Sequence, residues 1–319
     1  MDDMVGLLWS QLGWPLIRLT FFISLGILVG NFIEALNWTS RMAKLSAPLI
    51  RAGNLSDVSG ASFSLSFFSG VSGNTMLAEA YDQKRITKTE LVLGNLFNSL
   101  PAYFLHLPTM FFITVPLIRG AAVVYVGLTL LAAFLRTFLV LFIGRFVLPK
   151  RDRVCIDCEI RRGEKISAES AWRKTLSRFK LRILRVMMFT VPIYTSFVIL
   201  KQFAFFAWLE GLIASHLSFL TWLHPESLGV IVFQVVAEFT AGLAAAGVLL
   251  ESGTMNGREI ILALLVGNIL SSPVRGIRHQ FPVYAGIFTP KLALELIFYS
   301  QAFRVGSMIL VASGYYFLG

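Results

Sequence analysis

The chain has little charge and almost no cysteine. Of its 319 residues only 14% are Asp, Glu, Lys or Arg, whereas 56% are hydrophobic, and the mean hydropathy is +0.72. Because a soluble domain needs more polar side chains than this on its surface, the composition excludes that class and predicts an integral membrane protein. Two cysteines, Cys155 and Cys158, are too few for a disulfide framework. They could form half of a zinc site that no nearby His or Cys completes, so we expect no metal centre.

Motifs for catalysis are also missing. The sequence has no HExxH pair, no Walker loop and no glycine-rich turn between a strand and a helix. We therefore expect no enzymatic activity and no cofactor. The net charge of +10 does not indicate nucleic acid, because 12 of the 28 Lys and Arg fall within 150–185, in one loop between apolar segments.

Long apolar segments predict an all-α polytopic membrane protein. Six windows carry few charges over roughly twenty residues, which is enough to cross a hydrocarbon core of about 30 Å. These windows lie at about 17–36, 91–116, 120–148, 183–209, 260–277 and 292–317. Two further apolar windows, about 60–81 and 228–250, are interrupted near the middle by small and polar residues.

The order of elements is the same in two halves of the chain. Each half, 1–148 and 183–319, contains a spanning helix, an amphipathic connector, an interrupted segment and two more spanning helices, and a basic linker at 149–182 joins them. If each interrupted segment turns back as a re-entrant hairpin, each half crosses three times and the repeats are inverted. A cytoplasmic linker then puts 21 of the 28 Lys and Arg inside, in agreement with the positive-inside rule. We expect this topology in the cell membrane.

The hairpins and two short motifs supply a candidate solute site. The expected hairpin tips, Phe67–Met76 and Ala237–Gly247, would present free backbone N–H and C=O groups at membrane depth. The motifs GNLFNSLP and GNILSSP each place amides and hydroxyls at i, i+3 and i+4, on one helix face that then meets a proline. We expect both polar stripes to converge with the tips on a central site. The stripe residues are Asn95, Asn98, Ser99, Asn268, Ser271 and Ser272.

The residues of the first tip and the helix after it resemble the Gate, or nucleoside-recognition, superfamily. In VSGNTMLAEAYDQKRITKTELVLGNLF, residues 71–97, the stretch is similar to the first hairpin of concentrative nucleoside transporters, with Gly73, Asn74, Thr75 and Glu90 at matching positions. GNTM and NSLPAY also resemble the gate of the bacterial ferrous-iron permease, although the gate cysteines of that permease are absent. Spore-maturation membrane proteins belong to the same superfamily.

The second tip is similar to that of the nucleoside transporters as well. The resemblance of EFTAG, Glu238–Gly242, implies that Glu238, Phe239 and Thr240 face the substrate. It also implies a transporter or permease that moves a small polar, nucleoside-like solute by alternating access between the two hairpins. Coupling to H⁺ or Na⁺ would then involve Glu238.

Other interpretations of the same residues stay open at this point. The chain could be a scaffold or assembly factor like the spore-maturation proteins, or a divalent-metal permease. Glu238 could pair with Arg304 or Arg136, which lie deep in apolar segments. We expect the basic stretch RGIRHQFP, Arg275–Pro282, to contact anionic membrane lipid, and we expect a homo-oligomer.

Overall fold

A computed structural model of the chain describes residues 39–67, 70–150, 223–236 and 238–318, together with five isolated positions. Every secondary-structure element in these ranges is a helix. Several predicted features lie outside the described residues except at a few positions. They are the spanning helices at 17–36 and 183–209 and the linker at 149–182 with its two cysteines.

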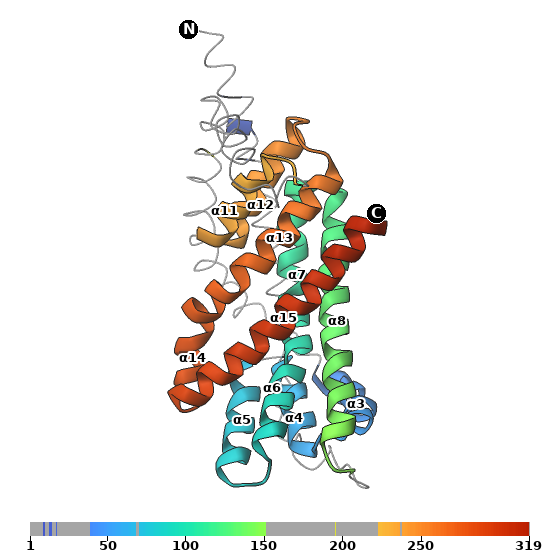
Figure 1. Cartoon of the computed structure of the whole chain (residues 1–319), viewed down its shortest axis with the longest axis vertical. Coiled ribbons are helices and arrows are strands. Elements are labelled where there is room, and N and C mark those ends of the chain that lie inside the picture. Colours follow the sequence, from blue (N-terminus) through green and yellow to red (C-terminus); the bar gives the residue numbers. More distant parts are fainter. Residues whose placement is uncertain are drawn as a thin grey trace, which may run out of the picture.

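The described part of the first half begins with one helix and a pair of short helices. α3 (Thr39–Ala52) precedes α4 (Asp57–Ser66) and α5 (Gly70–Asp82), and α4 and α5 pack against each other. α6 (Lys88–Phe97) and α7 (Ser99–Ile118) form one long helical stretch, with its break at position 98. The break lies just before Pro101, which has no N–H and whose ring displaces the carbonyl of residue 97. α8 (Ala121–Val147) then runs back along α6 and α7 (Figure 1).

In the second half a second pair of short helices again precedes a long helix. α11 (Ser227–Val236) packs against α12 (Phe239–Glu251), and both pack against α13 (Gly257–Arg275). Pro273 lies in the last turn of α13, and the chain continues as a π-helical segment, η4 (Gly276–Gln280), and a short helix, α14 (Phe281–Ala285). α15 (Pro290–Leu318) then returns along α13 and α8.

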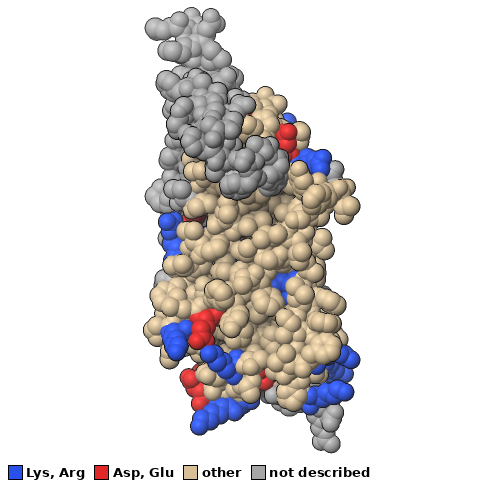
Figure 2. Space-filling view, viewed as in Figure 1, with Lys and Arg blue, Asp and Glu red and all other residues tan. Residues whose placement is uncertain are grey.

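Within the described residues, four helical stretches are long and apolar enough to cross a membrane. They are Lys88–Ile118, Ala121–Val147, Gly257–Gln280 and Pro290–Leu318. Large apolar side chains on α8 and α15, such as Phe134, Phe138, Phe142 and Phe298, are exposed. Figure 2 shows charged residues at both ends of this face and few in the belt between them. These observations identify an integral membrane protein, as the composition predicts.

The two pairs of short helices lie toward opposite ends of the described structure. Figure 1 shows α4 and α5 at the lower end beside the start of α6, and α11 and α12 in the upper part beside the start of α13. In both pairs a glycine allows close approach. A Cβ atom on Gly73 would lie 2.8 Å from the carbonyl oxygen of Ser62, and one on Gly242 would lie 2.7 Å from that of Val230.

The helices that follow the two pairs also begin alike. The side chain of Thr87 caps α6 by accepting a hydrogen bond from the Glu90 N–H, and that of Asn256 caps α13 by accepting one from the Glu259 N–H. Gly94, the first residue of its polar motif, follows its cap by seven residues, whereas Gly267 follows its cap by eleven. The second motif therefore lies about one helical turn further along its helix.

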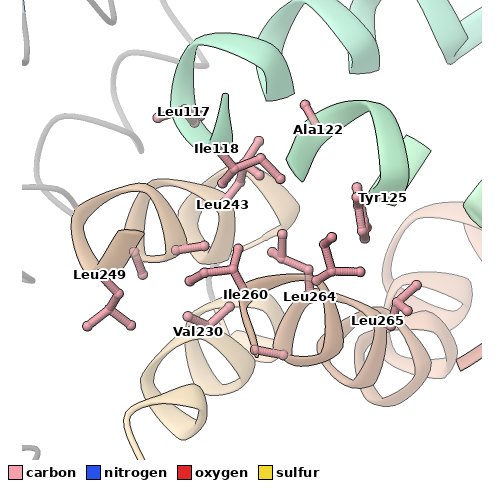
Figure 3. Packing of buried hydrophobic residues seen from close by; sticks show 14 of the residues in the cluster. Leu117, Ile118, Ala122, Tyr125, Val230, Leu243, Leu249, Ile260, Leu264 and Leu265 are labelled. Carbon is pink, nitrogen blue, oxygen red and sulfur yellow. The ribbon is translucent and has the colours of Figure 1, made fainter. Parts of the chain in front are cut away.

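The largest apolar core joins the two halves of the chain. Leu117, Ile118 and Ala122, at the junction of α7 and α8, meet Leu243 of α12 and Leu264 of α13 (Figure 3). All five side chains are at most 7% exposed. Burial of this core therefore needs both halves.

We predict that alanine at either glycine of the short-helix pairs destabilises the protein. Gly73→Ala and Gly242→Ala each put a methyl group against backbone, so each should lower the free energy of unfolding by about 1–3 kcal/mol. Gly127→Ala is the matched control, because a Cβ atom there meets nothing within 4 Å on α8. Thermal unfolding of the detergent-purified proteins measures the difference. If all three variants melt like the wild type, the close packing of the pairs is incorrect.

Candidate functional site: a cavity among the spanning helices

A cavity of about 470 Å³ lies among α7, α8, α12, α13, η4 and α15. Its polar lining includes Tyr103, Thr129, Arg136, Asn268 and Arg304. Arg304 is at the midpoint of the 29 residues of α15, and Arg136 is two residues past the midpoint of the 27 residues of α8. The cavity therefore lies near the middle of the apolar belt, where polar groups need partners inside the protein.

Neutral side chains hold two of the arginines on the cavity wall. Arg136 donates from Nε to the Ser99 hydroxyl at 3.0 Å, and Arg275 donates to the amide oxygen of Asn268. The Asn268 amide also donates to the Tyr125 hydroxyl at 3.4 Å. This polar face thus joins α7, α8 and α13, and two of its members, Ser99 and Asn268, belong to the predicted stripes.

The start of α12 forms another wall of the cavity. Phe239 lines it and stacks on Tyr125, with 6.1 Å between ring centroids and 13° between the planes. Glu238, just before the helix, has φ 147° and ψ 175°, a conformation that is essentially restricted to glycine. Strain of this kind persists only where the surrounding structure enforces it, and it is concentrated at functional sites.

Glu238 does not form the ion pair with Arg304 or Arg136 that the sequence left open as an alternative. Its carboxylate lies 3.6 Å from Nε2 of His279 in η4, and both side chains are partly exposed. η4 brings His279 close to the start of α12, and a π-helical turn after Pro273 is not visible in the residue pattern.

Both hairpin turns are shorter than predicted. α5 begins at Gly70, so Gly73, Asn74 and Thr75 are helical, and the Thr75 hydroxyl donates to the Val71 carbonyl of its own helix at 2.9 Å. In the second pair, α12 begins at Phe239, which makes Phe239 and Thr240 the first residues of a helix. The small residues that suggested open turns serve close helix packing instead.

The two asparagines of the first polar stripe form hydrogen bonds outside the cavity. Asn95 donates to the amide oxygen of Asn74 at 2.9 Å and to the hydroxyl of Tyr284, from the second half, at 3.0 Å. Asn98 donates to the Ser62 hydroxyl at 2.7 Å. All three asparagines are at most 7% exposed. They hold α4, α5 and α6 together in this conformation, and their predicted contact with solute stays a prediction.

The second stripe is split between the cavity and the helix interface. Asn268 lines the cavity, whereas Ser272 donates to the amide oxygen of Gln301 at 2.6 Å. Gln301 in turn donates to Gln280 at 3.0 Å. Ser271 is buried and its hydroxyl lies 3.5 Å from its own helix's Asn268 carbonyl.

Two side chains of the stretch RGIRHQFP line the cavity, which was not predicted from the sequence. Arg275 and Gln280 line the cavity, whereas Ile277, Arg278 and His279 between them are exposed, as a lipid-contacting helix end would require. Because η4 has i to i+5 hydrogen bonds, residues five apart lie nearer to one face than they would in an α-helix. A signal was present: arginine in an apolar segment is a functional candidate by default.

The chain is similar to uncharacterised archaeal proteins. Protein MJ0871 of Methanocaldococcus jannaschii is 24% identical over 306 residues, which cover 93% of this chain and 92% of the relative. Protein MJ1556 of the same organism is 26% identical over 91% of this chain and 89% of its own length. No protein-family profile matches the chain, and no solved structure matches it.

We predict that Asn74 and Asn95 stabilise the fold through each other. Leucine at either position leaves a buried amide without its partner, so each single variant should be less stable than the wild type. In a double-mutant cycle the coupling should be about 0.6 kcal/mol, with about 1.7 kcal/mol as the upper bound for hydrogen bonds inside membranes. Thr75→Val is the control, because that hydroxyl bonds only within its helix. A coupling of zero in detergent unfolding experiments would contradict the observed pairing.

Proposed function

We propose that the chain is a secondary transporter or permease that moves a small polar, nucleoside-sized solute through the central cavity by alternating access. The cavity is the observation that carries this proposal. It lies at mid-depth, its wall comes from both halves of the chain, and its volume falls within the range of small-molecule sites. Polar groups so deep in an apolar belt are typical of solute and ion pathways.

The packing of the helices favours inverted repeats, the arrangement found in many secondary transporters. α4 and α5 contact α6 as α11 and α12 contact α13. α6 contacts α8 and α15, and α13 contacts α15 and α8. If the halves are exchanged, so that α6 takes the place of α13 and α8 that of α15, each of these contacts becomes another contact that is also present. The two pairs of short helices lie toward opposite ends (Figure 1).

The proposed gates are the two pairs of short helices. α12 contacts α7 and supplies Phe239 to the cavity, so movement of α11 and α12 would open the cavity toward the upper end. α5 contacts α6, and Asn95 of α6 donates a hydrogen bond to Tyr284 in α14, the segment after η4. Movement of α4 and α5 would open the lower side. The strained Glu238 lies at the gate formed by α11 and α12, where protonation or a bound cation could bias the position of that gate.

The lower end of the described structure is the proposed cytoplasmic side. The α5–α6 loop with Lys84 and Arg85, and Lys150 after α8, lie at that end (Figure 1). The positive-inside rule favours such loops in the cytoplasm. A cytoplasmic position for the linker at 149–182 follows, because it begins where α8 ends.

Uptake into proteoliposomes tests the transport proposal. Ala102 lines the cavity from α7, so the indole of Ala102→Trp should fill the cavity. Uptake of a transported solute should fall at least about tenfold, which corresponds to a loss of about 1.4 kcal/mol in the free energy of solute binding. Leu131→Trp is the matched control, because Leu131 is 54% exposed on α8. Labelled nucleosides, phosphate esters and dicarboxylates are the solutes to test. Uptake that Ala102→Trp leaves unchanged, while the variant melts like the wild type, would contradict the proposed route.

A further inference from the structure

Three arginines from different helices meet at the central cavity. Arg136 of α8, Arg275 of α13 and Arg304 of α15 all line it. Arg304 is close enough to interact electrostatically with both of the others. A guanidinium group stays protonated in proteins, so the cavity wall holds three positive charges at membrane depth.

The described residues supply only one nearby carboxylate against these charges. No Asp or Glu is among the described residues that line the cavity, and Glu238, which interacts with Arg275, has its carboxylate beside His279. The hydrogen-bond partners of Arg136 and Arg275 are a neutral hydroxyl and a neutral amide. Within the described ranges the Arg304 guanidinium has no hydrogen bond or ion pair, and the buried Nε of Arg275 has no acceptor.

Such a cluster is unfavourable while the cavity is empty. Like charges repel strongly where water does not screen them, and burial of a cation without a counterion is costly. An arrangement of this kind is therefore poor as structural support, but it suits a ligand that brings the missing negative charge. Guanidinium groups bind carboxylates and phosphates through two parallel hydrogen bonds, which makes arginine the usual receptor for both.

The other walls of the cavity limit what kind of anion fits. α12 begins at Phe239, so the N–H groups of its first turn and the positive end of its dipole lie at the cavity. Phe239, Met110, Ile113 and Met308 add apolar side chains to the lining of the same cavity. A ligand that satisfies both kinds of lining has an anionic head and an apolar or aromatic body.

We infer that the cavity binds a small organic dianion, a phosphate monoester or a dicarboxylate, whose charge Arg136, Arg275 and Arg304 neutralise. Three guanidinium groups and the carboxylate of Glu238 leave a net charge of two positive charges, which balances the two negative charges of such a ligand. This inference rests on the proposed function for the passage of the ligand, but binding itself can be measured without transport.

The test is ligand binding to the full chain in detergent. The probes are adenosine monophosphate, succinate and inorganic phosphate, with adenosine as the neutral counterpart, and titration calorimetry gives their Kd values. The wild type should bind adenosine monophosphate or succinate at least tenfold more tightly than adenosine. Arg304→Gln should weaken that binding about 10- to 100-fold, as expected for loss of a hydrogen bond to a charged group. Arg304→Lys should retain part of it, and Arg258→Gln, on the exposed start of α13, should bind like the wild type.

The melting temperature without ligand gives an independent readout. If Arg304 belongs to a site kept for an anion, Arg304→Gln removes a repelling charge and should melt at the same temperature as the wild type or higher. A lower melting temperature, together with unchanged affinity for the dianions, would assign Arg304 a structural role and overturn the inference.

Phosphate is also present in lipid headgroups, so vesicles separate the two sources. Protein in phosphatidylcholine vesicles should bind the soluble dianions without any anionic lipid. If only phosphatidylglycerol raises the melting temperature and no soluble probe binds, the inference of a solute site is wrong. Dianion binding without uptake would support the site and contradict the transport proposal, whereas adenosine uptake that Arg304→Gln leaves unchanged would support transport and overturn the dianion site.

Discussion

The bilayer provides no water to polar groups in its core, and this constraint accounts for most of what the structure contains. Every described element is a helix, because a helix satisfies its own backbone hydrogen bonds. Asn95 bonds Asn74 and Tyr284, and Ser272 bonds Gln301, so these buried polar side chains find partners on other helices. The arginines of the central cavity are an exception of another kind among the described residues, because their charges lack enough nearby carboxylates, and the inferred dianion site follows from that exception.

The two halves depend on each other for both core and cavity. The junction of α7 and α8 is buried by α12 and α13, and the cavity next to this core takes Arg136 from the first half and Arg304 from the second. Each pair of short helices instead packs closely on itself through Gly73 or Gly242. Two compact pairs are well suited to move as units, which is what the proposed gates at opposite ends require.

Much of the fold could be predicted from the sequence, but the cavity lining could not. The apolar segments at 120–148 and 292–317 correspond closely to α8 and α15, because length and hydropathy alone determine a spanning helix. The lining depends on tertiary contacts. Arg275, the residue before η4, lines the cavity, and the Glu238 carboxylate lies beside His279 of η4. Both positions depend on the π-helical segment that follows Pro273. Local spacing predicted Asn95 and Asn98 on one helix face, yet it gave no information on which neighbours these side chains would meet.

Access to the cavity from both sides of the membrane is the central claim of this account. The most direct measurement is thiol labelling of Thr129→Cys, which lines the cavity, with Cys155 and Cys158 replaced by serine. A membrane-impermeant reagent should label this position in right-side-out vesicles and also in inside-out vesicles, because alternating access requires one state open to each side. Labelling from one side only, under every ligand condition, would contradict alternating access and favour a scaffold with a one-sided pocket.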